Sequence, residues 1–144
     1  MTAEVLILHT GGTIGMVPGP NGLAPAPGLQ QRIEQQLGSS LALLPSFDLL
    51  EISPLIDSAD LTPGHWQQLA ALLAEHWDGY RGFIILHGTD TMAYSAAALS
   101  FMLAGTRNCD EIHELYSSGN PHKIANGFYF NSWMGGEDGS ADRL

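Results

Sequence analysis

Two short segments share one pattern, and this pattern strongly limits the folds that the chain can adopt. "VLILHTGGT" and "GFIILHGTDT" each join an apolar run to a histidine, glycine and threonine. A continuous apolar run bounded by turn residues is typical of a strand that is buried on both faces. Residues 5–8 and 83–86 are therefore predicted to be strands of a sheet that is covered by other elements.

Helical patterns separate these strands. "LQQRIEQQL" carries apolar residues at Leu29, Ile33 and Leu37, a spacing of four that places them on one helix face. A second helix is predicted to start near Pro63, capped by Asp60 or Thr62, because proline is tolerated in the first helical turn. A third, Ala-rich helix over residues 92–103 is apolar nearly all round and is expected to be well buried.

The alternation of strands and helices predicts the fold class. A further strand is expected in "FDLLEIS", between the first two helices. Strands that alternate with helices form parallel sheets covered on both faces, so we predict an α/β, doubly wound (Rossmann-like), mostly parallel sheet. Residues 1–103 are expected to form this domain, and 104–144 an atypical, poorly ordered tail with a short helix over 111–116. The longest plausible strand of the tail is 128–130.

The tail offers no continuous apolar run, so the sheet is expected to be incomplete on its C-terminal side. The edge of strand 83–86 and the apolar flank of helix 92–103 would then stay uncovered. The isolated chain is therefore predicted to aggregate or to need a partner. The Pro/Gly-rich segment "VPGPNGLAPAPG" is expected to form no regular structure, and residues 17–27 to be the most mobile part of the first hundred, acting as a lid.

Charge and composition exclude several classes of function. A formal charge of −10 repels phosphate backbones and anionic membranes, so nucleic-acid and membrane partners are not expected. The single Cys109 cannot pair within the chain. The N-terminus shows neither a signal peptide nor a membrane span, which favours the cytoplasm. No metal is expected: His9 and His87 lack partners at ligand spacing and are predicted to be hydrogen-bonded instead.

The two threonine-containing turns follow strands that are expected to be neighbours, at the edge where parallel sheets bind ligands. Their glycines let backbone N–H groups converge on a phosphate or on the oxyanion of an attacked carbonyl. In the second case Thr13 is the candidate nucleophile, and Thr89 with Asp90 the proton acceptor, with both hydroxyls in one pocket. The alternative is structural: such threonines, and Asp90, are common helix caps.

Three motifs resemble the asparaginase/glutaminase family, in particular its cytoplasmic type I L-asparaginases. They are "HTGGTIGM", "PLIDSADLTPGHW" and "ILHGTDTMAYSAAALSFML", in the order typical of that family. The resemblance implies a cofactor-free amidohydrolase acting on L-asparagine, with homo-oligomers, dimeric or tetrameric, for full-length relatives. It implies catalytic roles for Thr13, Thr89 and Asp90, with Asp90 binding the substrate's α-amino group. Substrate binding is implied for the following residues: Gly12, Asp57, Ser58 and Gly88.

The chain also departs from this family. Leu23 stands in the loop where many members have a tyrosine, and Ala59 where relatives carry a polar residue. Members continue with a strand ending in "TGSQ", a catalytic-site lysine and a smaller C-terminal domain, whereas the only lysine here is Lys123. The sequence therefore leaves open an L-asparaginase, a glutaminase-type amidohydrolase, and an inactive truncated fragment of such an enzyme.

Overall fold

The computed structural model describes residues 3–103, 109–115 and 127–132. The helices are α1 (Leu29–Leu37), α2 (Pro63–His76) and α3 (Met92–Met102), with short 3-10 turns at Thr13–Gly15, Gly38–Leu43, Ser58–Asp60 and Trp77–Gly79. The strands are β1 (Val5–His9), β2 (Met16–Gly19), β3 (Gly22–Pro25), β4 (Phe47–Glu51), β5 (Gly82–Leu86), β6 (Cys109–Leu115) and β7 (Gly127–Ser132). No helix in these described parts of the chain is long and apolar enough to cross a membrane.

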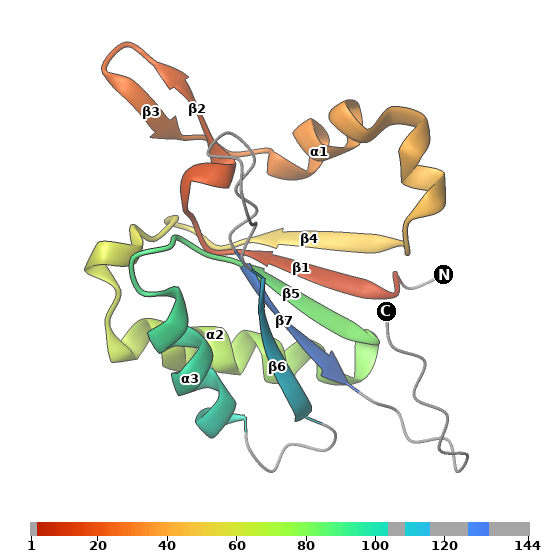
Figure 1. The fold of residues 1–144 in the computed structure, drawn as a ribbon, viewed down its shortest axis with the longest axis vertical. Helices are drawn as coiled ribbons and strands as arrows, with labels where there is room; N and C mark the ends of the chain where they lie inside the picture. Colours follow the sequence, from red (N-terminus) through yellow and green to blue (C-terminus); the bar gives the residue numbers. More distant parts are fainter. Residues whose placement is uncertain (1–2, 104–108, 116–126, 133–144) are drawn as a thin grey trace.

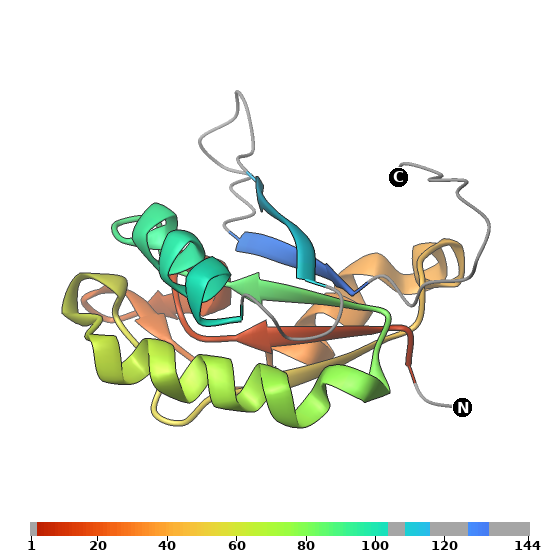
Figure 2. The same ribbon diagram turned by 90° about the horizontal axis from the view of Figure 1, so that it is seen from below.

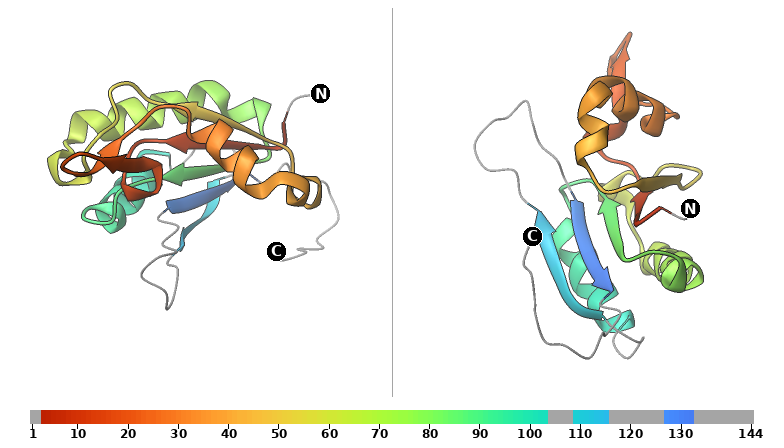
Figure 3. Two further views of the ribbon diagram at one scale, coloured as in Figure 1. Left: turned by 90° about the horizontal axis from the view of Figure 1, so that it is seen from above. Right: turned by 90° about the vertical axis from the view of Figure 1, so that its right-hand side faces the viewer.

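The main sheet has the order β4-β1-β5-β7-β6 (Figure 1). β1 pairs in parallel with both β4 and β5, so the predicted neighbours β1 and β5 do lie side by side. The connections β1-α1-β4 and β4-α2-β5 run in opposite directions across the sheet, and right-handed crossovers then place their helices on opposite faces. Figures 2 and 3 show α1 and α2 on opposite sides of the strands, which confirms the α/β, doubly wound arrangement.

The core lies between the sheet and the two helices α2 and α3, which pack on the same face of it. Alternate strand residues point into it, Leu6 and Leu8 from β1 and Phe83 and Ile85 from β5. They pack against the buried sides of the two helices, which contribute Leu69, Leu73, Met92, Ala96 and Leu99. α3 is less buried than its sequence predicts, because Tyr94 and Phe101 are 70% and 81% exposed on its outer side. The apolar flank expected on this helix is therefore present.

Local sequence signals define the other helix ends. Pro63 begins α2, and the N-cap residue Thr62 accepts the N3 backbone N–H in a capping box with His65, so Thr62 rather than Asp60 is the cap. α1 matches the predicted helix at both ends.

The Pro/Gly-rich segment, which is predicted to form no regular structure, differs from that prediction. β2 and β3 form an antiparallel hairpin, with Gly19 opposite Gly22 at its tip. A two-stranded ribbon leaves half of its N–H groups unpaired, so prolines are tolerated there as at a sheet edge. Gly22, with a φ of 115°, allows the tight turn. The hairpin projects beyond the main sheet next to α1 (Figures 1 and 3).

The C-terminal tail, which is predicted to be poorly ordered with one short helix, also differs from its prediction. The short helix predicted over residues 111–116 is wrong, because residues 109–115 form the strand β6. The predicted strand 128–130 lies within β7. β7 pairs antiparallel with β5, and β6 pairs with β7. The prediction that the edge of β5 stays uncovered is therefore wrong, because the antiparallel strand β7 occupies it. The remaining residues of the predicted tail lie outside the described residues.

Candidate active site

Two turns meet at the carboxyl ends of β1 and β5. The first turn comprises residues 10–15 and the second turn residues 88–91. The strands are in register, with His9 opposite Leu86, so both strands end at the same level of the sheet. Thr10 fixes the junction: its N–H and its hydroxyl both donate to the carbonyl of Leu86, at 3.0 and 2.9 Å. The turns predicted to share one site are thus adjacent in space.

The glycines of the first turn are required by this close packing. Gly11 and Gly12 have φ values of 139° and 89°, which side chains other than glycine rarely adopt. A Cβ atom on Gly11 would overlap the carbonyl oxygen of Ile56. A Cβ atom on Gly12 would lie 2.9 Å from the backbone nitrogen of Gly88, so the two turns touch at this point. Thr13 follows directly, exposed at the start of the short 3-10 turn.

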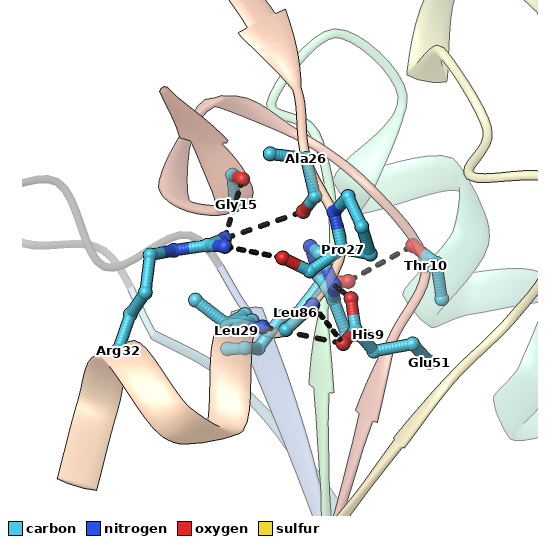
Figure 4. A network of polar contacts seen from close by, with 10 residues as sticks. His9, Thr10, Gly15, Ala26, Pro27, Leu29, Arg32, Glu51 and Leu86 are labelled. Atoms are coloured by element: carbon cyan, nitrogen blue, oxygen red, sulfur yellow. Dashed lines mark hydrogen bonds and ion pairs between the residues drawn. The ribbon is translucent and has the colours of Figure 1, made fainter. Parts of the chain in front are cut away.

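A network of hydrogen bonds around the carboxylate of Glu51 lies next to the first turn (Figure 4). Glu51, at the end of β4, accepts the ring N–H of His9 at 3.2 Å. Its other oxygen accepts the backbone N–H groups of Gly28 and Leu29 at the start of α1, at 2.8 and 3.2 Å. Partial burial tends to raise the pKa of Glu51, but these hydrogen bonds outweigh it and lower that pKa below its ordinary value.

His9 is completely buried below the turn. Burial lowers its pKa more strongly than Glu51 raises it, so the ring is neutral at neutral pH. Since the carboxylate accepts from Nδ1, the lone pair is on Nε2, which packs against Gly15. Among the described residues, Nε2 is the buried side-chain atom that has no hydrogen-bond partner.

Arg32 of α1 ties both ends of the β2–β3 hairpin to the same network. Its guanidinium donates to the carbonyl of Gly15 at 2.8 Å, immediately before β2. It also donates to the carbonyls of Pro27 and Ala26, at 2.6 and 3.3 Å, immediately after β3. The planar fork of arginine suits such simultaneous contacts (Figure 4). The hairpin is therefore closed at its base by one side chain.

The second turn contacts the "DSAD" segment. Ser58 is buried, and its hydroxyl lies 3.4 Å from a carboxylate oxygen of Asp90, a long hydrogen bond. Thr91 donates its hydroxyl to the carbonyl of Ser58 at 2.8 Å. A Cβ atom on Gly88 would overlap the Ser58 side chain. Ser58, Gly88 and Asp90 are thus brought together.

The predicted alternative, that Asp90 caps the following helix, is wrong, whereas Asp57 does cap a short turn. The N-cap residue of α3 is Thr91, so Asp90 lies outside the helix and remains exposed. Asp57, in contrast, accepts the backbone N–H of Ala59 at 3.0 Å and caps the turn Ser58–Asp60. Thr89 is exposed beside Asp90.

A hydrogen-bond chain that leads from the partly buried Trp66 to the buried His87 supports the second turn. Trp66 of α2 donates to the Ser95 hydroxyl at 2.9 Å, and Ser95 of α3 lies 2.8 Å from Nε2 of His87. Nδ1 of His87 lies 2.6 Å from the carbonyl of Gly88. Ser95 and His87 are both completely buried. The predicted hydrogen-bonding roles of His9 and His87 are therefore confirmed.

Sequence reasoning missed several residues of these networks. Glu51 carries a weak signal, a carboxylate at the end of an apolar strand, and Ser95 another, a lone hydroxyl on the inner face of an apolar helix. Arg32 gives none, because its partners are backbone carbonyls. In the described residues, no group of three or more His, Cys, Asp or Glu side chains could hold a metal ion.

Comparison with known proteins decides the family. Residues 4–108 match the family model described as "Asparaginase, N-terminal", which is more than half of the chain. The chain belongs to the asparaginase family. This asparaginase-family chain is 47% identical to L-asparaginase 1 of Escherichia coli K12 over 101 residues, which cover 69% of the chain and 30% of that protein.

Solved structures agree with the family assignment. L-asparaginase I from Vibrio cholerae superposes with a TM-score of 0.63 at 42% identity, over 71% of this chain and 30% of that one. The L-asparaginase from Thermococcus kodakarensis gives 0.54 at 33% identity, over 69% and 30%. The asparaginase-family chain therefore spans about 30% of the length of these relatives.

A relative of another name matches more of the chain. The mouse "60 kDa lysophospholipase" is 34% identical over 144 aligned residues, which cover 81% of this asparaginase-family chain and 26% of that protein. Sequence similarity to this chain is therefore not limited to proteins named L-asparaginase.

Proposed function

We propose that this chain forms the threonine half of an L-asparaginase-type active site. One observation carries the proposal: the two glycine-threonine turns touch at Gly12 and Gly88, with Thr13 and Thr89 exposed on the turns and Asp90 beside them. Several relatives are named L-asparaginase, which supports an amide as substrate. L-asparagine is the proposed substrate, and no cofactor is required by the chemistry.

In the proposed reaction Thr13 is the nucleophile. Its hydroxyl oxygen attacks the side-chain amide carbon of asparagine, and its proton passes to the Thr89–Asp90 side of the site. Backbone N–H groups of the turns stabilise the oxyanion. The carbon–nitrogen bond then breaks, the proton leaves with the amine as ammonia, and an acyl ester remains on Thr13. Water attacks this ester, giving aspartate and free Thr13.

Substrate binding is proposed for the groups around Asp90. An exposed carboxylate fits the substrate's α-amino group, and the buried Ser58 hydroxyl next to it fits the α-carboxylate. Asp57 is proposed to hold Ser58 in place through the capped turn. Gly12 and Gly88, which let the two turns pack closely, are proposed to bring their backbone groups up to the substrate.

The competing function is an inactive fragment. The chain spans about 30% of its asparaginase relatives, and its single Lys123 lies outside the described residues. The family resemblance implies that a lysine and a second domain complete the site, and we propose that activity requires both. We also propose a cytoplasmic location, because a similar protein from Campylobacter jejuni is named "Probable Cytoplasmic L-asparaginase". A homo-oligomer is proposed for the complete site.

Complementation tests the proposal. The chain is mixed with the remaining part of E. coli L-asparaginase 1, and ammonia release from L-asparagine and from L-glutamine is measured separately. Turnover of asparagine is expected in the mixture, and Thr13→Ala should reduce it by about 1,000-fold or more, since a missing nucleophile leaves only binding and oxyanion contacts. Thr10→Ser, which keeps the buried hydroxyl at the same turn, is the matched control. Equal activity of the Thr13→Ala mixture would refute the nucleophile, and no ammonia in any mixture would favour the inactive fragment.

A further inference from the structure

The chain of hydrogen bonds behind the second turn has a defined direction. The indole N–H of Trp66 can only donate, so Ser95 accepts it with its hydroxyl oxygen. The Gly88 carbonyl can only accept, so Nδ1 of His87 carries the proton of that contact. A neutral imidazole then has its lone pair on Nε2, which accepts the hydroxyl proton of Ser95. All three contacts are satisfied by this single arrangement.

The surroundings keep His87 in this state. The ring is completely buried, and burial lowers its pKa more strongly than the Gly88 carbonyl raises it. The ring is therefore neutral at neutral pH, with one donor and one acceptor nitrogen. These hydrogen bonds join α2, α3 and the end of β5, so the positions of both helices affect the position of the second turn.

The last bond of the chain orients a peptide group. In a trans peptide the C=O and N–H point in opposite directions, and the cis bond in the described residues is Ser53–Pro54. Because the Gly88 carbonyl points inward to His87, the N–H of Thr89 points away from the buried ring. That N–H belongs to a residue exposed on the proposed site. The orientation of this peptide is therefore set by a group that does not reach the substrate.

We propose that Trp66, Ser95 and His87 are positioning residues that fix the Gly88–Thr89 peptide for catalysis. This inference rests on the proposed amidohydrolase function, and its first test does not depend on turnover. A positioned backbone N–H stabilises charge that develops in the transition state, whereas a mobile peptide must reorganise during the reaction. Loss of these hydrogen bonds should therefore lower kcat and leave KM nearly unchanged.

The first experiment determines the tautomer of His87 in the full chain. Nitrogen-15 NMR of the labelled imidazole rings, assigned with a His87→Gln variant, distinguishes a protonated Nδ1 from a protonated Nε2. A neutral ring protonated on Nδ1 at neutral pH is expected. A ring protonated on Nε2, or a doubly protonated ring, would overturn the inference, because neither fits a Ser95 hydroxyl donating to Nε2.

The second experiment compares two serines of the same helix. Ser95→Ala removes the hydroxyl inside the chain, while Ser100→Ala removes one that donates only to the Ala97 carbonyl, at 2.6 Å. Ser95→Ala is expected to shift the amide resonance of Thr89 and to lower kcat of the complemented enzyme about ten-fold. Ser100→Ala is expected to change neither.

A second variant keeps the inference testable if the Ser95→Ala protein does not fold. Trp66→Phe keeps an aromatic ring on α2 and removes only the donor to Ser95, so a smaller shift of the Thr89 amide and a two- to three-fold lower kcat are expected. If the Thr89 amide is unchanged in every folded variant, or if KM rises while kcat stays constant, the inference is wrong. If no mixture releases ammonia, the proposed function fails, and the tautomer and the Thr89 shifts alone decide the hydrogen-bond chain.

Discussion

The two turns of the proposed site are held by networks of different character. The first turn rests on His9, Glu51 and Arg32, a network with two formal charges that reaches the half-exposed base of a hairpin. The second rests on Trp66, Ser95 and His87, which are uncharged and join buried helix faces. Both networks use a neutral histidine that donates from Nδ1.

The difference lies in what each network holds. The charged groups of the first bond mainly to backbone carbonyl and N–H groups of residues 15–29, a segment that projects from the sheet. The neutral hydrogen-bond chain of the second network ends on the carbonyl of Gly88 inside the domain. Charged groups can stay partly hydrated and still hold an exposed segment, whereas a buried chain requires neutral, fully paired groups. The hairpin side is therefore expected to open more easily than the helix side.

The largest expected effect comes from the glycine at the start of the first turn. Gly11→Ala adds a Cβ atom that overlaps the Ile56 carbonyl, at a φ of 139°. A backbone clash at a positive φ is expected to cost about 3–5 kcal/mol of unfolding free energy, measured by urea denaturation.

Gly22→Ala is the matched control. It has a φ of 115° at the tip of the hairpin, but its Cβ atom would meet nothing within 4 Å. The strain alone is expected to cost about 1 kcal/mol. Equal losses in both variants would show that the close approach to Ile56 contributes nothing, and would remove the packing argument for the first turn.

The parts of the fold that were predictable from sequence have local signals. α1, α2 and the strands β1, β4 and β5 follow from periodicity, from Pro63 and from continuous apolar runs. The neighbouring positions of β1 and β5 followed from the sheet class. The β2–β3 hairpin was missed because its prolines discourage a strand assignment, although a two-stranded ribbon tolerates them.

The remaining features depend on contacts between residues far apart in the chain. β6 carries neither a clear alternation nor an apolar run, and its strand state depends on pairing with β7. His9 meets Glu51 42 positions away, and Trp66 meets Ser95 29 positions away. Such pairs leave no spacing that a single sequence reveals. Motif resemblance located the threonines, Ser58 and Asp90, whereas the networks that hold them required the structure.

The next effect tests the charged network directly. Arg32→Lys keeps the positive charge but replaces the planar fork with one ammonium, which cannot reach the Gly15 and Pro27 carbonyls together. A loss of about 1–2 kcal/mol is expected. Amide hydrogen exchange in residues 16–25 should accelerate more than exchange in α2 or α3, which would also show that the hairpin is the more mobile region.

Arg81→Lys serves as its control. Arg81 pairs with Glu4 at 3.2 Å on the surface, where the two side chains are 81% and 46% exposed. Exposed pairs contribute little, so a change within about 0.5 kcal/mol is expected. If both lysine variants behave alike, or if exchange in the hairpin is unchanged, the guanidinium of Arg32 does not close the hairpin.

The smallest effect concerns Glu51 and its dependence on pH. Glu51→Gln keeps an oxygen for the N–H groups of Gly28 and Leu29 but removes the charge at the start of α1, which is expected to cost about 1 kcal/mol at neutral pH. In the native chain the pKa of this carboxyl is lowered, so its stabilisation is present above the unfolded value of 4.5. It is lost as the pH falls through the lower, folded pKa.

The histidines add a separate loss of folding stability at higher pH, and Glu51→Gln should retain it. The pKa values of His9 and His87 are both lowered from 6.5 by burial, so the unfolded chain binds protons that the folded chain excludes. Stability therefore falls as the pH drops below 6.5 toward the folded pKa values in the native chain. Glu51→Gln keeps this loss, and the part due to His9 should grow, because the carboxylate that raises the pKa of His9 is gone. Urea denaturation between pH 7 and pH 3 should show the further loss below pH 4.5 only in the native chain. Stability that rises on acidification from pH 7 to pH 5 would contradict neutral, buried histidines in both networks, and an unchanged acid limb in Glu51→Gln would show that another carboxyl causes it.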